Sequence, residues 1–521
     1  MVKDIHRRGL VVVVLVFLLS LVSRSWGQRV PVVEKTLPNG MKLLMVERHN
    51  EPTIAGGWVA HVGSANERPG ITGIAHLFEH MMFKGTQTIG TKDYSKDREI
   101  IAQQEIVRDQ MRAEEAKMRA AYRRGEIDDL MRPENMTPKW RELKKQFDGL
   151  IAQQRALMVK DEFDLVYTTA GGSRLNAFTD NDETVYFITV PANKMELWMW
   201  MESDRLLNPV FREFYSERDV VYEERRLRTE SPPLGKAEEA FEAMFWGGHP
   251  YAWPVIGWPS DVSAISKAQA DEFYSIYYSP QNLTLVLVGD FKTDDAVAMA
   301  NRYFDRIPRG KIDPPDMITT DPGHPVEKRM YASAQANPQV WMQWHTVPFA
   351  HRDSYPLTVL SRLLSDRTGR LHKSLVLKAK LATSVSAYSS NEKWGGSFNI
   401  SAEAREGHTP EQCEQAVYAE LEKLAKEDVP PDELQKVKNQ FAAGEYRRLS
   451  SNFAVFMQLI RCEAKNDWQE INEAGPKVQA VTAADVRRVV NQYFTATNRA
   501  VAIITRSGPA TRPAGKMPAS R

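Results

Sequence analysis

Cysteine is scarce in this 521-residue chain, which has only Cys413 and Cys462, both late in the sequence. Their spacing is not that of metal ligands, so a cysteine-based metal site is excluded. Two arrangements stay open. The cysteines form one disulfide, which an oxidising compartment would allow, or they are two buried free thiols.

The chain also lacks an excess of either charge. It has 68 Lys and Arg against 67 Asp and Glu, a net charge of +1, which gives no electrostatic basis for binding nucleic acid. Hydrophobic content of 42% and charged content of 26% are ordinary for a globular protein. A length of 521 residues is too great for one core, so we expect two or more domains.

Long apolar runs are missing except near the N-terminus. Three basic residues precede the run Leu10–Val22, and small residues follow it at Ser25 and Gly27. This order is typical of a secretory signal peptide, so residues 1–27 are predicted to be cut off after Gly27. The run is short for a membrane span, and an uncleaved anchor is the alternative. We expect export to a bacterial periplasm or an extracellular space, with no membrane span after cleavage.

Histidine is also sparse, at 11 residues, yet two histidines stand in the segment His76-Leu-Phe-Glu-His80. On a helix these two positions lie one turn apart on the same face, where two imidazoles can bind one metal ion. Glu79 lies beside them, close enough to take a proton from a metal-bound water. The H-x-x-E-H order reverses the commoner H-E-x-x-H motif and has the same mechanics. The plain alternative is a pair of surface or capping histidines.

A zinc hydrolase usually has three protein ligands, so the two histidines need a third. Candidates lie in the charged helical stretch Glu217–Glu224, whose two end residues are two turns apart and share a face. One could bind the metal while the other orients a histidine. The residues alone leave Glu217, Glu223 and Glu224 open as the third ligand. A solvated acidic-basic helix is the alternative interpretation.

The first residues after the predicted cleavage site indicate β-structure. Asn39-Gly40 is a hairpin turn signal, and a predicted strand follows it at 41–46. A second strand is predicted at 54–62, before the histidine motif.

Residues from about 96 to 165 differ in character from the rest of the first half. They are rich in charged and helix-forming residues, and Thr137 followed by Pro138 is a predicted helix start after a break. We expect an antiparallel helical hairpin, inserted on the surface. One interpretation is an insertion without a direct role in function. The other is a functional element that contacts a partner or covers a substrate opening.

The chain repeats itself at the scale of a domain. A predicted helix and strand at 262–288 match those at 478–504 without a gap, and the aligned residues Asn282 and Asn498 are 216 positions apart. A lag of this size indicates duplicated domains. Only the first half contains the H-x-x-E-H motif.

The predicted boundaries follow from the repeat and from composition. A catalytic domain at 28–310 and a non-catalytic homologous domain at 326–506 are separated by a linker at 311–325 that is dense in Pro and Gly. The tail at 507–521 is predicted to be disordered.

Several motifs resemble the insulinase (pitrilysin) family of zinc peptidases, and the resemblance covers essentially the whole chain after the leader. The matching segments are Leu37–Gly40, Gly63–Glu67, Gly73–Thr86, Asn176–Thr179, Thr184–Tyr186, Glu217–Glu224, His249–Tyr251 and Gly395–Phe398. The similarity is strongest to the short-chain branch that includes mitochondrial processing peptidase and bacterial processing proteases. It implies an α+β fold of two homologous domains, each a mainly antiparallel sheet flanked by helices, and two such chains closing around a chamber.

The resemblance also implies roles for individual residues. One Zn²⁺ per chain would be held by His76, His80 and Glu224, with Glu79 as general base and Glu217 as an acid that orients a ligand. The implied activity is that of a zinc-dependent endopeptidase that hydrolyses peptides or unfolded polypeptides with a zinc-activated water.

The implied substrate contact is an edge strand at Asn176 and Ala177, which would read an extended peptide by β-augmentation. A further expectation concerns the second domain, where the family usually has an Arg and a Tyr that hold the substrate carbonyl. The matching positions here are Val376 and Thr383, which cannot replace them. We therefore expect a heterodimer, in which a homologous partner chain supplies the Arg and the Tyr.

The separation of 144 residues between His80 and Glu224 also departs from the family, in which these ligands are usually about half as far apart in sequence. The predicted hairpin accounts for the additional residues. A non-catalytic scaffold subunit of the same fold is the alternative function, and an enzyme dedicated to one substrate is a third possibility.

Overall fold

The computed structural model describes residues 29–130, 132–320, 326–365 and 367–507. The predicted signal peptide at 1–27 lies outside the described residues, as do residues 321–325 of the predicted linker and all but the first residue of the predicted tail.

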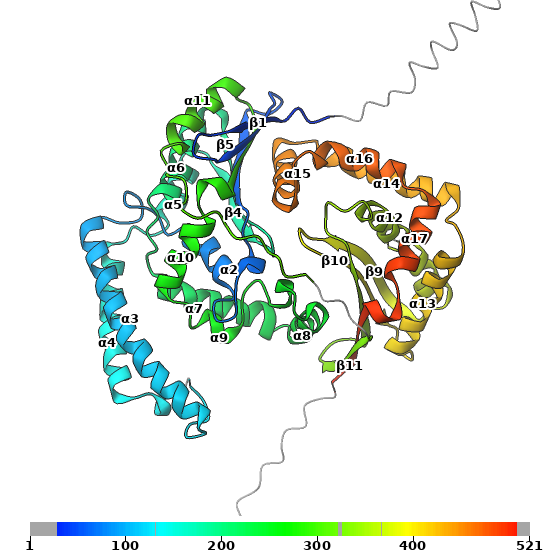
Figure 1. Cartoon of the computed structure of the whole chain (residues 1–521), viewed down its shortest axis with the longest axis horizontal. Helices are drawn as coiled ribbons and strands as arrows, with labels where there is room; N and C mark the ends of the chain where they lie inside the picture. The colour runs from blue at the N-terminus through cyan, green and yellow to red at the C-terminus, as the bar shows by residue number, and fades with distance from the viewer. Residues whose placement is uncertain (1–28, 131, 321–325, 366, 508–521) are drawn as a thin grey trace, which may run out of the picture.

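The first half of the chain forms a six-stranded sheet (Figure 1). The strand order is β1 (Val33–Thr36), β2 (Lys42–Glu47), β6 (Leu283–Gly289), β3 (Thr53–Ala60), β5 (Thr184–Pro191) and β4 (Ser173–Thr179). The expected turn at Asn39-Gly40 is confirmed, because β1 and β2 pair as an antiparallel hairpin and Gly40 has a φ of +95°. A left-handed φ of this kind is accessible to glycine without steric cost.

The second half forms a five-stranded sheet with the same topology. Its order is β7 (Lys328–Ala334), β11 (Arg499–Arg506), β8 (Gln339–Thr346), β10 (Gly396–Ala404) and β9 (Ala382–Asn391). This order matches β2, β6, β3, β5 and β4 of the first sheet, and the single parallel pairing is at the same place in each. The expected α+β fold of two homologous, mainly antiparallel domains is confirmed.

The repeated asparagines explain part of the duplication in physical terms. Asn282 follows helix α10 (Lys267–Tyr277), and Asn498 follows helix α17 (Ala483–Tyr493). The side-chain amide of Asn282 donates to the carbonyls of Tyr277 and His61, and that of Asn498 donates to the carbonyls of Tyr493 and His345. Each asparagine therefore ties the end of its helix to the end of the central strand of its sheet.

The two halves exchange covering helices, an arrangement that no sequence pattern predicted. Helix α15 (Asn452–Lys465) of the second half packs its apolar face on the first sheet, and helix α8 (Gly235–Trp246) of the first half packs on the second sheet (Figure 1). Gly57 in β3 shows how close the approach is, because a Cβ there would lie 2.6 Å from Cζ of Phe456 in α15. Two hydrophobic clusters, one on each sheet, are thus built from both halves of the chain, whereas the largest cluster of each half contains only its own residues.

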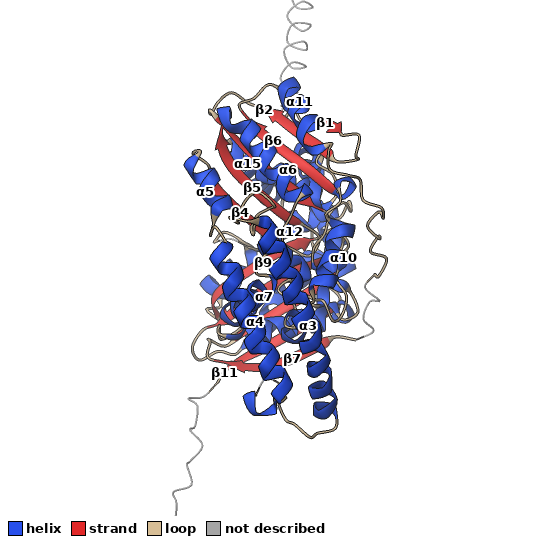
Figure 2. Ribbon diagram, turned by 90° about the vertical axis from the view of Figure 1, so that its left-hand side faces the viewer, coloured by secondary structure: helices blue, strands red, loops and turns tan. Residues whose placement is uncertain are grey.

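The expected hairpin is confirmed as two long antiparallel helices, α3 (Tyr94–Arg123) and α4 (Pro138–Leu157), which lie side by side at one flank (Figures 1 and 2). Thr137 caps α4, since its hydroxyl accepts the amide hydrogen of Trp140 at 3.0 Å. The distance along the chain from His61 to Asn282 is 221 residues, against 153 for the equivalent residues of the second half. The difference of 68 is close to the length of the hairpin.

A buried ion pair joins the base of the hairpin to the first domain. Asp97 of α3 and Arg212 are fully buried and lie 2.5 Å apart, and Gln154 of α4 also donates to Asp97 at 2.8 Å. Arg212 in addition donates to the carbonyls of Lys84 and Ile89, in the loop that follows the histidine motif. The hairpin is therefore anchored next to the candidate site.

Other helices complete the two domains. They are α2 (Ile74–Met81), α5 (Glu162–Thr169), α6 (Met195–Leu207), α7 (Phe214–Arg225), α9 (Pro259–Val262), α11 (Thr293–Phe304), α12 (Ser354–Leu364), α13 (Pro410–Lys426), α14 (Pro431–Arg448) and α16 (Glu470–Ala480). Within the described part of the chain, no helix has both the length and the apolar character that crossing a bilayer requires. Cys413 and Cys462 are unpaired thiols, which settles the alternative that the sequence left open.

Candidate metal centre

Helix α2 carries the histidine motif, and its amphipathic pattern fixes which side chains face the core. The buried carboxylate of Glu67 accepts the amide hydrogens of Gly73 and Ala75 at 2.8 and 2.9 Å, which satisfies donors at the start of the helix. Five apolar residues pin the opposite face in the core, namely Ile74, Ala75, Leu77, Phe78 and Met81. The helix is thus held so that the motif projects from its other face.

The structure brings His76, His80 and Glu224 together. A ligand atom of each lies within 4.8 Å of the others, although Glu224 comes from α7, far along the chain. Oε2 of Glu224 lies 3.2 Å from Nε2 of His80 and 3.8 Å from Nε2 of His76. Glu223 does not join them, because its side chain is 61% exposed and pairs with Arg226. Of the three acids that the sequence left open, Glu224 is the one that faces both histidines.

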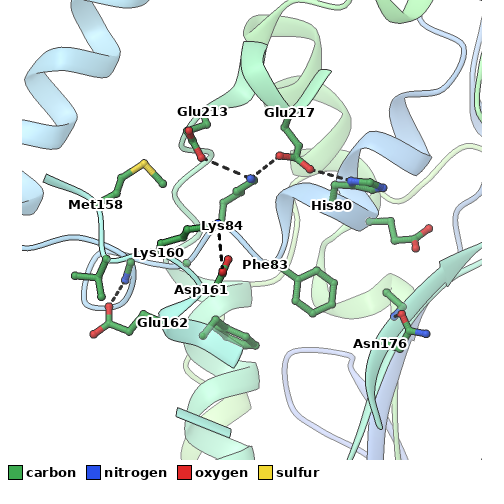
Figure 3. Close-up of a pocket in the computed structure, with 16 residues that line it drawn as sticks. His80, Phe83, Lys84, Met158, Lys160, Asp161, Glu162, Asn176, Glu213 and Glu217 are labelled. Carbon is green, nitrogen blue, oxygen red and sulfur yellow. Dashed lines mark hydrogen bonds and ion pairs between the residues drawn. The ribbon is translucent and has the colours of Figure 1, made fainter. Parts of the chain in front are cut away.

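Glu217 lies one layer behind these residues. Its Oε1 accepts a hydrogen bond of 2.9 Å from Nδ1 of His80, and its Oε2 lies 2.5 Å from Nζ of Lys84. Figure 3 shows Lys84 between Glu213 and Glu217, with Glu217 reaching His80. The family resemblance implied this place for Glu217, whereas no sequence signal pointed to Lys84, which directly follows Phe83 after α2.

The two histidines differ in their charge states. Burial, together with the positive charges of His80 and Arg228, lowers the pKa of His76 to about 3, so its imidazole is neutral. Burial lowers the pKa of His80, but the hydrogen bond to Glu217 and the charges of the neighbouring carboxylates outweigh it, so the pKa is raised. Because Nδ1–H of His80 is directed to Glu217, Nε2 is the nitrogen that faces the cluster, and it would release its proton on binding a metal. Two imidazoles and one carboxylate are the donor set of many catalytic zinc sites, so the residues fit Zn²⁺.

Glu79 is positioned to act as a base at the same place. Its Oε2 lies 4.0 Å from Nε2 of His76 and accepts a hydrogen bond of 2.7 Å from the hydroxyl of Thr179. Burial raises the pKa of Glu79 above its ordinary value, and the bond from Thr179 opposes that shift. A raised pKa brings a carboxylate nearer to the range in which it exchanges protons efficiently at neutral pH.

Strand β4, which contains Asn176 and Ala177, lies at the edge of the first sheet. It pairs with β5 on one side, and no described strand covers its other side. Asn176 is exposed, Ala177 is buried, and the strand has a register shift before Asn176. Because Thr179 at the end of β4 bonds to Glu79, this open edge runs directly to the histidine cluster.

A pocket of about 350 Å³ opens beside the cluster, between α2, β4 and the loop that joins α4 to α5 (Figure 3). Apolar side chains form part of its wall and charged ones another part. Its lining residues include Phe83, Met158, Val159 and Phe163, and also Glu79, His80, Lys84, Lys160, Glu162, Asn176 and Glu217. No sequence signal pointed to the residues 158–163, because their contribution depends on how the inserted hairpin returns to the domain.

Val376 and Thr383, the positions expected to lack the Arg and Tyr, are engaged within the second half. Val376 lies in the π-helical turn His372–Lys378 and packs partly buried on the second core. The hydroxyl of Thr383, near the start of β9, donates to Glu403 at 2.7 Å.

Two family models match the chain. Residues 42–119 match the model described as insulinase (peptidase family M16), and residues 264–441 match the model described as peptidase M16 inactive domain. The first match includes His76, Glu79 and His80 and ends before Glu224, while the second excludes all four residues.

Relatives and solved structures agree with these matches. The zinc protease PqqE of Helicobacter pylori is 26% identical over 478 residues, which are 88% of this chain and 89% of that protein. A crystal structure of a protease from Helicobacter pylori superimposes with a TM-score of 0.74 at 22% identity and covers 92% of this chain and 100% of its own. The periplasmic protease PqqL of Escherichia coli gives a TM-score of 0.68 at 16% identity and covers 92% of this chain and 48% of its own. The two structures establish the likeness of fold.

Proposed function

The chain belongs to the insulinase family, peptidase family M16, and from that premise we propose that it is a zinc-dependent endopeptidase acting on peptides and unfolded polypeptides. The observation that carries the proposal is the convergence of His76, His80 and Glu224 beside Glu79. A scaffold has no physical need for three metal-binding groups and a base in one place.

Zinc would be held by His76, His80 and Glu224, with Glu217 keeping the imidazole of His80 in the orientation that binds. When bound, zinc supplies a Lewis acid that makes water more acidic and polarises a carbonyl group. Side chains and backbone groups of this chain would transfer the proton and hold the substrate.

Glu79 would move the proton. Its carboxylate takes a proton from the water that attacks the carbonyl carbon of the peptide bond. The same proton then passes from Glu79 to the nitrogen as the carbon–nitrogen bond breaks. The bond from Thr179 holds Glu79 in place for both transfers, at the end of the edge strand.

Strand β4 would hold the substrate in an extended conformation. Its open edge offers backbone N–H and C=O groups at Asn176 and Ala177, and these groups bind any extended chain with little regard to sequence. A substrate bound in this way has to be a peptide or an unfolded segment. The side chain next to the cleaved bond would enter the 350 Å³ pocket.

We further propose that the protein is exported and works with a homologous partner chain. Residues 1–27 have the pattern of a signal peptide, and the structurally similar PqqL is described as a periplasmic protease. That protein is about twice as long as the part that this chain matches, which is the length of two such chains. The partner would provide the Arg and Tyr that Val376 and Thr383 do not.

A second candidate function is that of a non-catalytic subunit. One specific observation favours it, the match of residues 264–441 to a model described as an inactive domain. That match covers the end of the first half and most of the second, and it does not include His76, Glu79, His80 or Glu224.

The test is zinc content and hydrolysis of β-casein, an unfolded protein, by the protein purified without residues 1–27. We expect about one zinc per chain, loss of hydrolysis on chelation and its return with zinc. Glu79→Gln should retain zinc and lose hydrolysis by about 10³-fold or more. Absence of zinc from a folded, zinc-exposed sample would favour the non-catalytic subunit.

A further inference from the structure

Arg228 is an exposed arginine held against the ligand cluster. Its Nη1 atom lies 2.8 Å from Oε1 of Glu224, while Oε2 of the same carboxylate faces the two histidines. The side chain of Arg228 is 72% exposed, and no described residue other than Glu224 forms an ion pair or hydrogen bond with it. A guanidinium has five N–H donors, so most of them are available to a ligand.

The backbone that carries Arg228 is unusual. Helix α7 ends at Arg225 and continues as the π-helical turn Arg226–Glu230, in which the amide of Ser231 donates to the carbonyl of Arg226 at 2.8 Å. Single π-helical turns within helices occur frequently at functional sites. Here the turn carries the guanidinium back to Glu224, four residues earlier in the chain.

Arg228 contacts the cluster but is not part of the pocket wall. The pocket is lined by Glu79 and His80, and neither Glu224 nor Arg228 contributes to it. Burial is the larger influence on the pKa values of His76 and Glu79, and the charge of Arg228 acts on both as well. The guanidinium is therefore close to the metal ligands through the carboxylate of Glu224 that it contacts, and it does not line the pocket.

We propose that Arg228 is a further catalytic residue, which donates hydrogen bonds to the carbonyl oxygen of the peptide bond being cleaved. The inference rests on the proposed peptidase function. Arg228 would supply a cationic donor from the first half, whereas Val376 and Thr383 occupy the second-half positions where the family usually has an Arg and a Tyr.

The charge that Arg228 would stabilise follows from the bond changes. The water oxygen bonds to the carbonyl carbon, and the π-electron pair of the C=O bond moves to the carbonyl oxygen, while Glu79 takes the water proton. The pair then returns to form the new carboxyl group, the carbon–nitrogen bond breaks, and the nitrogen takes the proton from Glu79. The oxygen is most negative between these events, which is where a preorganised N–H donor has its largest effect.

The competing explanation is that Arg228 only orients Glu224. A residue with that role would change the affinity for zinc, typically by 10- to 100-fold, whereas a donor to the substrate oxygen would change the affinity for a transition-state analogue. Arg226 provides the matched control, because it is two residues away on the same exposed turn and contacts Glu223 and not Glu224.

The experiment measures zinc affinity and the binding of two ligands by calorimetry. The first ligand is a phosphinic tetrapeptide, with phenylalanine and leucine side chains on either side of the tetrahedral phosphorus. The second ligand is the matching peptide with an ordinary amide bond. Its binding is measured with proteins that also carry Glu79→Gln, so that the peptide is not hydrolysed.

We expect Arg228→Ala to weaken binding of the phosphinic peptide about 100-fold, which is the effect of removing one oxyanion donor. Binding of the ordinary peptide and of zinc should change by less than about threefold, Arg228→Lys should retain part of the effect, and Arg226→Ala should behave as the original protein. Unchanged binding of the phosphinic peptide would overturn the inference. So would weakened zinc binding with recovery of phosphinic-peptide binding at saturating zinc. If the proposed peptidase function itself were wrong, the protein without substitutions would bind no zinc, which is measured first.

Discussion

The Nδ1 atom of His80 lies 2.9 Å from Oε1 of Glu217, and Nζ of Lys84 lies 2.5 Å from Oε2 of the same carboxylate. A histidine of α2 and an acid of α7 are thereby fixed to each other, with a lysine neutralising the acid. The pKa of Glu217 is lowered, because burial alone would raise it and the bonds from His80 and Lys84 outweigh that effect. The carboxylate therefore stays ionised and can hold the Nδ1 proton.

Glu217→Gln is expected to weaken zinc binding about 10- to 100-fold without abolishing it. The amide keeps the shape of the side chain, but it has no negative charge to favour the Nδ1–H tautomer and the orientation of His80. The dissociation constant can be measured by competition with a chromophoric chelator. Glu223→Gln is the control, since Glu223 is an exposed acid on the same helix that pairs only with Arg226 among the described residues. Equal zinc affinity in the two variants would contradict the role assigned to Glu217.

Local sequence signals predicted the elements that carry the site. The i, i+4 spacing of His76 and His80 indicated one helical face, and the Thr137-Pro138 pair marked the start of the second hairpin helix. The repeat around Asn282 and Asn498 indicated the duplicated topology. These features depend on residues that are close in sequence or on periodicity, so a single chain was sufficient to find them.

Contacts between residues that are far apart in the sequence could not be predicted in the same way. The apolar face of α15 shows that this helix is buried, but it does not say that the partner is the sheet of the other half. The α7 segment offered Glu217, Glu223 and Glu224 as equivalent acids, and only the resemblance to a family distinguished them. Arg228 was missed, although its spacing of four from Glu224 is a signal that a search for helical ion pairs would find.

The exchange of helices predicts that a mutation in the second half destabilises the first sheet. Phe456 in α15 is fully buried against β3 and β5, so Phe456→Ala should lower the free energy of unfolding by about 3–5 kcal/mol. Amide hydrogen exchange in β3 should become faster. Phe441→Ala is the control, because Phe441 is a buried phenylalanine of α14 that packs on the core of the second sheet. If Phe456→Ala accelerated exchange in β8 and left β3 unchanged, the cores would not be shared as described.

A second consequence of the shared interface concerns pH. Glu183, in the turn before β5, is 1% exposed, and its Oε2 has no hydrogen-bond partner among the described residues. Burial, with the nearby charge of Asp180, raises the pKa of Glu183 to about 8, and Lys465 only partly opposes the shift. In the unfolded chain the same group has a pKa of about 4.5.

The raised pKa of Glu183 makes the folded protein less stable as pH rises. Below pH 4.5 the carboxyl group is protonated in the folded and the unfolded state, so it does not make folding stability depend on pH. Between pH 4.5 and 8 the unfolded chain has released the proton that the folded chain retains, so folding stability falls by up to roughly 1.4 kcal/mol per pH unit. Above pH 8 the difference stays constant.

Glu183→Gln removes this titration and should be more stable than the original protein by an amount that grows from pH 5 to pH 8. The measurement is the free energy of unfolding in denaturant at intervals of half a pH unit, with the difference between the two proteins plotted against pH. Glu134→Gln is the control, because Glu134 is exposed in the turn between the hairpin helices and should give a difference that does not vary with pH. A difference for Glu183→Gln that is equally independent of pH would mean that the buried carboxyl ionises as readily in the folded protein as in the unfolded chain.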